Sequence, residues 1–340
     1  MMKYKSVTVT ERGGPEVLQI VENDLRPPTA REARIKVLAT GVGRTDINYR
    51  YGLSPFSPKV PFVPGYEIMG VVDAIGSEIS KVAVGDRVAA LTGHGGYSEM
   101  IYLGQEHLVP VLPSLDPGEV AVVVLNYVSA YQMLHRVAKV NAGDKVLING
   151  ASGGMGTALL ELGKQAGLKM YGTASQSKHP ILTEFGAIPI DYHSQDFVEV
   201  LRQMEPNGLD FVFDGMGGEY SNRCLAVLKR GGKLVAYAAP VGILSILRDF
   251  LKIILVNLLP NGKSVEFYGI TALYLRDKKP FMEDLPKLFH LLAEGKIKPV
   301  VTAKFPLLEA REANELLEDG QVTGNLVLLA PELLISKEAK

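Results

Sequence analysis

The sequence has a single cysteine, Cys224, and no tryptophan among its 340 residues. One cysteine excludes an intramolecular disulfide and any all-cysteine zinc cluster. The chain also lacks an excess of either charge, since 36 Lys and Arg residues stand against 37 Asp and Glu residues. It therefore builds no broad positive field, and nucleic acid is not expected to be a main partner.

The chain lacks an uninterrupted apolar run long enough to span a membrane. The nearest candidate, residues 243–259, is broken by Arg248, Asp249 and Lys252. The N-terminus runs from Met1 directly into strand-like alternation and has no apolar core typical of a signal peptide. These features, with the single cysteine, predict a cytoplasmic protein.

The composition, with 47% hydrophobic and 21% charged residues, is that of a globular protein. At about 100–200 residues per domain, two domains are expected. In the first third, short alternating segments such as 34–39 and 71–75 lie between turn signals, and prolines punctuate the loop over residues 55–64. Many short strands joined by Gly and Pro turns predict an all-β, barrel-like module.

From about residue 126, strands are expected to alternate with helices. A helix is predicted between the first two strands, because apolar residues recur at helical spacing over residues 158–166. The alternation predicts an α/β domain with a doubly wound parallel sheet, covered on both faces. Four apolar segments are its expected strands: 145–149, 169–174, 210–214 and 233–238.

A glycine-rich turn, residues 149–156, is the sharpest motif. It lies between a predicted strand and a predicted helix, as a dinucleotide site requires. Small residues let the backbone approach a pyrophosphate, whose charge is favoured by free N–H groups at a helix N-terminus. An ordinary tight turn would carry similar glycines, but the strand–helix–strand setting favours a dinucleotide. The candidate contacts are Gly150, Ser152, Gly153, Gly154, Met155 and Gly156.

The residues after the next strand favour NADPH over NADH. An NAD site usually carries an acid about 20 residues after the glycines, bonded to the ribose 2′-hydroxyl. Residues 171–179 contain no acid here, but they include Ser175 and Lys178, which suit a 2′-phosphate. Tyr192, after the following strand, is a further candidate. The alternative is that Lys178 is a solvated surface lysine.

Several stretches resemble the medium-chain dehydrogenase/reductases, specifically their zinc-independent, zeta-crystallin-like quinone oxidoreductase group. The matching stretches follow one another in the family's order: 64–72, 84–88, 129–134, 150–156 and 323–328. The resemblance implies a GroES-like β-barrel catalytic domain over residues 1–125, completed by residues 267–340. It also implies a Rossmann domain over residues 126–266 that binds NADP(H), and a homodimer.

The resemblance further implies where the cofactor lies. NADPH would occupy a cleft between the two domains, with its nicotinamide near Ser129. Hydride would pass to a quinone or to the activated C=C of an α,β-unsaturated carbonyl. Further cofactor contacts are implied at Ala238, Ala239, Tyr268, Gly269, Ile270, Gly324 and Asn325.

Zinc ligands of the related alcohol dehydrogenases are replaced in this chain. A cysteine precedes their Thr-Asp, whereas Arg44 precedes Thr45 and Asp46 here, and their Gly-His-Glu motif has Tyr66 in place of the histidine. A zinc site needs about three or four well-placed ligands, and the six histidines are scattered. The sequence therefore predicts no metal.

No residue of the sequence stands out as a general acid. Without a metal, a carbonyl oxygen has no Lewis acid to polarise it, so conjugate reduction is more plausible than plain alcohol oxidation. A developing enolate oxygen would need a donor, for which Tyr51, Tyr66, Ser129 and water are candidates. Asp46 is expected to orient its neighbours. For each tyrosine the alternative is a packing role.

Residues 243–259 place apolar side chains on almost every face of a predicted helix. Three interpretations stay open: a packing or dimer-interface helix, a wall of the substrate site, and contact with a membrane surface. The last belongs to an alternative function, in which an NADPH-binding protein serves mainly in sensing or interaction and has little catalytic activity.

Overall fold

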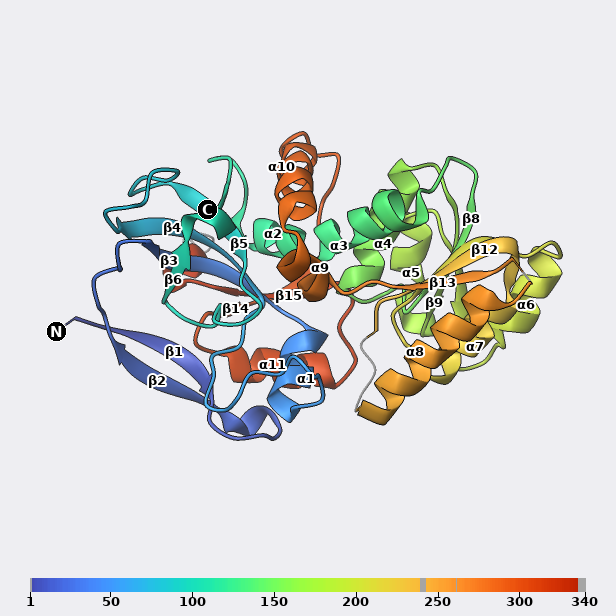
Figure 1. Cartoon of the computed structure of the whole chain (residues 1–340), viewed down its shortest axis with the longest axis horizontal. Coiled ribbons are helices and arrows are strands. Elements are labelled where there is room, and N and C mark those ends of the chain that lie inside the picture. The colour runs from blue at the N-terminus through green and yellow to red at the C-terminus, as the bar shows by residue number, and fades with distance from the viewer. Residues whose placement is uncertain (1, 239–242, 261, 336–340) are drawn as a thin grey trace. The chain divides into compact units, whose positions relative to one another are not determined.

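The computed structural model describes residues 2–238, 243–260 and 262–335. The chain divides into two compact units: residues 1–128 with 279–340, and residues 129–278 (Figure 1). The observed boundaries follow residues 128 and 278, whereas the predicted boundaries follow residues 125 and 266. The second shifts because α9 (Ile270–Arg276) still belongs with the middle unit.

A six-stranded parallel sheet forms the middle unit, in the order β10-β9-β8-β11-β12-β13. The chain builds outward from β8 in one direction and from β11 in the other, so the order reverses between these two strands. The strands are β8 (Lys145–Asn149), β9 (Lys169–Ala174), β10 (Ile188–Asp191), β11 (Leu209–Asp214), β12 (Leu228–Ala236) and β13 (Ser264–Phe267). The four predicted strands are present. β12 begins and ends earlier than the predicted 233–238; its start was missed because residues 229–232 are polar or glycine and give no apolar signal.

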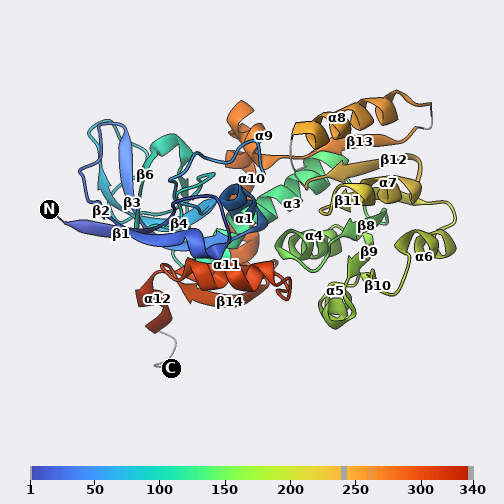
Figure 2. The ribbon, with the colours of Figure 1, turned by 90° about the horizontal axis from the view of Figure 1, so that it is seen from below.

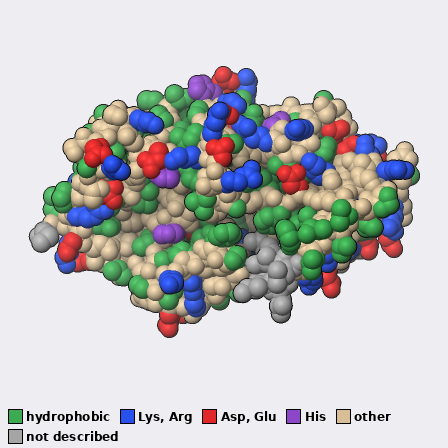
Figure 3. Space-filling view, in the orientation of Figure 1, with side chains coloured by type: hydrophobic (Ala, Val, Ile, Leu, Met, Phe, Trp, Pro, Cys, Tyr) green, Lys and Arg blue, Asp and Glu red, His purple; other side chains and the backbone are tan. Residues whose placement is uncertain are grey.

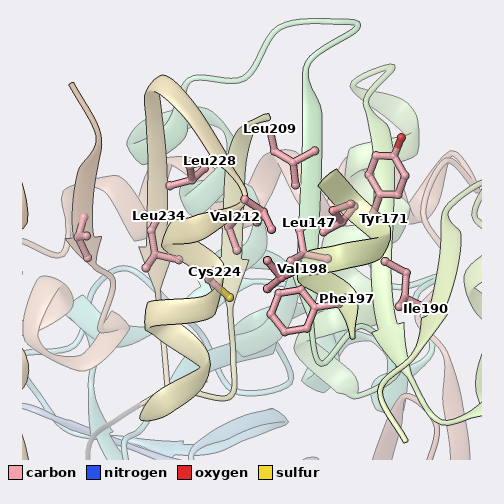
Figure 4. Close-up of a cluster of buried hydrophobic side chains, with 13 residues drawn as sticks. Leu147, Tyr171, Ile190, Phe197, Val198, Leu209, Val212, Cys224, Leu228 and Leu234 are labelled. Carbon is pink, nitrogen blue, oxygen red and sulfur yellow. The ribbon is translucent and has the colours of Figure 1, made fainter. Parts of the chain in front are cut away.

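Helices cover both faces of this sheet, as predicted (Figure 2). On one face, α6 and α7 pack against Leu147, Tyr171 and Leu234 in a buried cluster (Figure 4). Adjacent residues of a strand point to opposite faces of the sheet. The side chain of Met170, next to Tyr171 in β9, therefore points to the other face, where it lies against Gly163 of α4. The helices are α4 (Gly154–Gln165), α5 (His179–Glu184), α6 (Phe197–Met204), α7 (Glu219–Ala226), α8 (Ile243–Leu258) and α9.

The other unit contains a seven-stranded sheet in the order β14-β15-β3-β4-β5-β7, with β6 also paired to β3, and a separate β1–β2 pair. Its strands are β1 (Lys3–Val9), β2 (Leu18–Asp24), β3 (Glu32–Val42), β4 (Glu67–Ile75), β5 (Arg87–Leu91), β6 (Met100–Gly104), β7 (Val109–Pro110), β14 (Val301–Pro306) and β15 (Asn325–Leu329). Its helices include α1 (Arg44–Tyr51), α2 (Pro117–Val122), α10 (Lys279–Ala293), α11 (Ala310–Glu318) and α12 (Pro331–Ile335). The antiparallel pairing of β15 with β3 brings the two ends of the chain into one sheet.

Glu205 ties the amino end of the parallel sheet to the end of α6. Its buried carboxylate accepts hydrogen bonds from Lys145 Nζ (2.5 Å), Lys169 Nζ (2.6 Å) and the Tyr171 hydroxyl (2.7 Å). Desolvation opposes ionisation, but these three donors outweigh it and lower the pKa of Glu205 to about 2. The ionised carboxylate therefore cross-links β8 and β9 at neutral pH.

Glu205→Gln is expected to destabilise the protein at pH 7 by about 1–3 kcal/mol, because charge-assisted hydrogen bonds are lost. The folded-state pKa is lowered, so the stabilisation is present above the unfolded pKa and is lost as pH falls toward 2. Urea unfolding at pH 7 and pH 3 should therefore show a smaller difference between variant and parent at pH 3. Glu199→Gln, at an exposed position of the same helix, is the control. An equal loss at both pH values would contradict this account.

Candidate functional site

The glycine-rich turn joins β8 to α4 at the carboxyl edge of the parallel sheet. Gly150 has φ +85°, a left-handed conformation that favours glycine. A Cβ on Gly156 would lie 2.5 Å from the backbone carbonyl carbon of Ala151, so the helix and turn pack too closely for a side chain. A Cβ on Gly153 would have no neighbour nearer than 4.0 Å. The turn therefore combines tight internal packing with an open approach at Gly153.

Backbone N–H groups of this turn divide into two sets. The N–H groups of Gly150 and Ala151 point inward, where they donate to Thr173 Oγ1 (2.9 Å) and Thr173 O (3.0 Å). No side chain caps α4, whose N-cap residue is Gly153. The first N–H groups of a helix have no intrahelical acceptor, so those of residues 154–156 are available to an anion such as a pyrophosphate.

The residues predicted to hold a 2′-phosphate come together at the same edge. Ser175 and Lys178 follow β9, and Tyr192 follows β10. These strands are parallel neighbours, with Asp191 in register with Ala174. Burial lowers the pKa of Lys178, while the Tyr192 side chain is exposed. Two hydroxyls and an amino group thus lie beside the turn, and residues 175–178 contain no acid.

Ser129 is 1% exposed, and its hydroxyl has no hydrogen-bond partner in the described part of the chain. A buried hydroxyl without a partner costs free energy, so this residue fits a group brought by a ligand. Tyr268 is also buried, and its hydroxyl donates to Gln132 Oε1 (2.9 Å). The Tyr268 hydroxyl is therefore used in a hydrogen bond inside the protein.

The other implied contacts fall into two places. Ala238 follows β12, and Gly269 and Ile270 follow β13, at the carboxyl edge of the parallel sheet; Ala239 lies outside the described residues. Gly324 and Asn325 belong to the other unit. There the Asn325 side chain accepts from Asn126 Nδ2 (2.6 Å) and donates to Val300 O (2.9 Å), so it is engaged within its own unit.

Two buried carboxyl groups organise the start of α1 and β4. Asp46 is 3% exposed and accepts from the N–H groups of Gly43 (3.0 Å) and Gly65 (2.9 Å). Burial raises the pKa of Asp46 to about 6, against the effect of these hydrogen bonds. Glu67 accepts from the Gly41 N–H (3.1 Å), and burial, with the charge of Asp46, raises its pKa well above the usual range. Both carboxyl groups hold backbone in place.

The two candidate tyrosines differ in exposure. Tyr66 is buried, with its ring 6.0 Å from that of Tyr49, and burial raises the pKa of its hydroxyl. Tyr51, at the end of α1, is 41% exposed, and the Arg50 guanidinium lies 4.8 Å from its ring. The Tyr51 residue is therefore partly open to a ligand, whereas Tyr66 packs in the core.

The residues at the position of the zinc site in related dehydrogenases do not fit the metal. Asp46 directs both carboxylate oxygens at backbone N–H groups, and Glu67 directs one. Tyr66 is a neutral phenol where the relatives have an imidazole, and Arg44 is an exposed cation. In the described ranges, no three His, Cys, Asp or Glu side chains are grouped so that they could hold a metal ion.

Three buried polar residues beneath the glycine turn were not predicted: Asn149, Thr173 and Asp214. Each is the last or next-to-last residue of an apolar strand, namely β8, β9 and β11. The only feature of the sequence that could have identified them is a polar residue at the end of an otherwise apolar strand. The sequence did not reveal that the three would be hydrogen-bonded to one another.

α8 is half-buried, where the sequence suggested apolar contact on nearly every face. Ile253 and Val256 pack against the sheet's core, and Asn257 bonds both backbone groups of Val265 in β13. Among the described side chains of residues 250–259, six apolar ones form an outward stripe: Phe250, Leu251, Ile254, Leu255, Leu258 and, just after the helix, Leu259, which are 40–76% exposed (Figure 3). We call these six residues the α8 stripe. Among the described residues, no helix is long and apolar enough to span a bilayer.

The two glycines of the turn should respond differently to alanine. Gly156→Ala is expected to lose about 1–3 kcal/mol of stability, because its Cβ overlaps the backbone of residue 151. Gly153→Ala should keep its melting temperature, since its φ of −79° and open surroundings accept alanine. It should instead weaken NADPH binding at least tenfold, about 1.4 kcal/mol, by blocking the approach. Thermal melts and cofactor titrations check both; unchanged binding by the Gly153 variant would contradict the role of the turn.

Comparisons with known proteins agree with this geometry. Residues 29–114 match the family described as alcohol dehydrogenase GroES-like domain, and residues 185–328 match the zinc-binding dehydrogenase family. Quinone oxidoreductase from Homo sapiens is 31% identical over 332 residues, which cover 96% of this chain and 97% of the relative. The synaptic vesicle membrane protein VAT-1 homolog of Danio rerio is 27% identical over 339 residues, 96% of this chain and 70% of that protein.

Among solved structures, Escherichia coli quinone oxidoreductase complexed with NADPH superposes with a TM-score of 0.85. It is 27% identical, and the match covers 96% of this chain and 99% of the other. The agreement in fold, extent and sequence identity is sufficient to assign a family. The chain belongs to the medium-chain dehydrogenase/reductase superfamily of oxidoreductases, in its quinone oxidoreductase group.

Proposed function

We propose that the protein is an NADPH-dependent, zinc-independent oxidoreductase that reduces quinones or the activated double bond of α,β-unsaturated carbonyl compounds. The observation that carries the proposal is the open, uncapped N-terminus of α4, beside the hydroxyl and amino groups of residues 175–178, a segment that contains no acid. When bound, NADPH supplies a hydride to an electron-poor acceptor. The E. coli relative solved with NADPH supports the choice of cofactor.

Residues of the middle unit divide the binding of NADPH among them. The N–H groups of residues 154–156 would hold the pyrophosphate, because they lack helical acceptors. Ser175, Lys178 and Tyr192 would hold the 2′-phosphate, since a phosphate accepts several charge-assisted hydrogen bonds. The unsatisfied Ser129 hydroxyl would meet the nicotinamide end.

The residues of the other unit suit a reduction that needs orientation more than strong acid catalysis. Asp46 and Glu67 act as positioning residues, because their oxygens hold the backbone around α1 and β4. The exposed Tyr51 hydroxyl, or water, would donate to a developing enolate oxygen. Since these side chains do not fit zinc, the chemistry proposed is conjugate or quinone reduction rather than alcohol oxidation.

Steady-state assays with a panel of quinones and enones test the reaction. Oxidation of NADPH by members of either class is expected, and elemental analysis should find no stoichiometric zinc. A folded protein that consumes no NADPH with any of these acceptors would contradict the proposed reaction.

Lys178→Ala tests the choice of NADPH. A charge-assisted contact is worth about 1.5–3 kcal/mol, so the variant should bind NADPH at least roughly tenfold more weakly and NADH almost as before. Fluorescence titration of the cofactor-free protein with both dinucleotides measures this. Lys164→Ala is a matched control, because that exposed lysine donates to Glu184 O instead. An equal loss for both cofactors would mean that Lys178 acts through the fold.

The α8 stripe favours a second candidate function, that of an NADPH-binding protein that contacts membranes. Six large apolar side chains lie exposed on one helix, and cations lie close to its C-terminal end. Arg230 lies near this end, since a Cβ on Gly262 would be 3.2 Å from its side chain, whereas the ammonium group of Lys263 donates to Leu225 O (2.7 Å). Apolar residues flanked by cations are typical of surfaces that bind anionic lipids. The name of the VAT-1 relative is consistent with this alternative.

A double variant, Leu255→Glu with Leu258→Glu, tests whether the α8 stripe contacts a membrane or another copy of the protein. If the stripe contacts membranes, the parent should co-sediment with phosphatidylserine-containing vesicles and the variant should stay in the supernatant. Leu275→Glu, at an equally exposed leucine of α9, is the control. A cytoplasmic enzyme should remain in the supernatant with or without the substitutions. If the variant instead turns a dimer into a monomer, the stripe covers the interface of the homodimer that we also propose.

A further inference from the structure

Asn149, Thr173 and Asp214 form a row across three neighbouring parallel strands. Asn149 is in register with Thr173 of β9 on one side and with Asp214 of β11 on the other. The Thr173 hydroxyl donates to Asn149 Oδ1 (2.7 Å), and Asn149 Nδ2 donates to Asp214 Oδ1 (2.9 Å). All three side chains are at least 97% buried. We call this hydrogen-bonded set the polar row; it crosses the sheet where the strand order reverses.

Both ends of the polar row hold backbone of a neighbouring loop. At one end, Thr173 Oγ1 accepts the Gly150 N–H (2.9 Å) of the glycine turn. At the other end, Asp214 Oδ1 accepts the N–H groups of Met216 (3.0 Å) and Gly217 (3.2 Å), in the loop after β11. Asp214 Oδ2 accepts the Ser221 hydroxyl (2.7 Å) from α7. The Asp214 carboxylate thus bonds one loop and a helix directly, and it is connected to the glycine turn through Asn149 and Thr173.

The two loops meet above the polar row. A Cβ on Gly150 would lie 3.4 Å from the Met216 sulfur, so the Met216 side chain rests against the glycine turn. Met216 is 53% exposed, which leaves its outer side open to a ligand. A shift of either loop would therefore move the surface on which a dinucleotide lies.

Because the polar row is buried, its side chains cannot exchange their hydrogen bonds for bonds to water. A buried carboxylate without hydrogen-bond donors costs several kcal/mol, so each of the four donors to Asp214 is held in place. The direction of these bonds also decides which N–H groups remain for a ligand. Those of Gly150, Met216 and Gly217 are turned inward, while the first N–H groups of α4 are left outward.

We propose that Asp214 is a positioning residue for the dinucleotide: through the polar row it sets the glycine turn and the Met216 loop in the geometry that receives the pyrophosphate. This inference rests on the proposed function, since it concerns the same cofactor. The pyrophosphate is common to NADPH and NADH, so Asp214 sets affinity for both. It does not set the preference between them, which belongs to the cluster around Lys178.

The test is Asp214→Asn, which keeps the shape and one acceptor oxygen while the new amide group can face the Ser221 hydroxyl. We expect the dissociation constants for NADPH and NADH to rise together by roughly tenfold, with their ratio unchanged. Direct fluorescence titration of the whole protein measures both. A parent protein that binds neither dinucleotide would contradict the proposed function itself, whereas normal binding by the parent and by the variant contradicts only the role of Asp214.

The matched control is Asp210→Asn, the same change at the amino end of the same strand. Asp210 accepts the Lys145 N–H (2.8 Å) and pairs with Lys229, far along β11 from the glycine turn. Its variant should lose some stability and keep both dissociation constants. If the two variants weaken binding equally for a given loss of stability, Asp214 acts only through global stability and the proposal fails.

Cys224 provides a second readout that does not depend on activity. It is the chain's one cysteine, it is fully buried, and its sulfur lies 3.8 Å from Asn149 Nδ2. A thiol reagent can reach it only when this region opens. NADPH should slow labelling of the parent, and Asp214→Asn should speed labelling and weaken that protection. If Asp214→Asn does not fold, Thr173→Val breaks the other end of the polar row, and it is expected to weaken binding of both dinucleotides and to speed labelling of Cys224. Unchanged labelling and binding in that variant would overturn the proposal.

Discussion

Three polar side chains at the carboxyl edge of the parallel sheet, Asn149, Thr173 and Asp214, are buried away from water and must bond to one another or to the backbone. The arrangement of the loops at this edge depends on that constraint. The strand order reverses between β8 and β11, and a reversal of this kind opens the crevice in which open α/β sheets bind ligands. Hydrogen bonds weaken steeply as their angle departs from linearity, so N–H groups that serve a ligand need a fixed direction. Asn149 and Asp214 give that direction because each is buried and bonded on both sides.

The other unit uses buried acids in a comparable way. Asp46 and Glu67 are costly to bury, which is why their pKa values are raised, to about 6 in the case of Asp46. The three N–H groups that they accept lie before α1, before β4 and within β3. The same carboxyl groups that could serve a metal in a related protein therefore serve the backbone here. The hydrogen bonds from these N–H groups offset part of the cost of burying the two carboxyl groups.

Patterns local in sequence predicted much of this fold. The apolar runs gave β8 and β9 with their observed bounds, and the glycines marked a turn that the structure forms between a strand and a helix. β13 was not predicted, because four residues of mixed character carry little signal. The polar row was missed for a different reason: a single polar residue at the end of a strand says nothing about its partner on the next strand. The open face of α8 also depends on what the helix packs against, which its own sequence does not encode.

In the proposed binding mode, affinity and selectivity for the cofactor depend on different strands at one edge of the sheet. The α4 N-terminus, Asn149 and Asp214 lie at the ends of β8 and β11 and would meet charge that every dinucleotide carries. Ser175, Lys178 and Tyr192 follow β9 and β10 and address the one phosphate that distinguishes NADPH. Thr173 belongs to both sets of strands, since it ends the polar row and lies two residues before Ser175. A disturbance of Thr173 would therefore reach both functions, whereas one at Asp214 or Lys178 would reach a single function. The sheet keeps these two roles separable because neighbouring parallel strands end side by side yet carry independent loops.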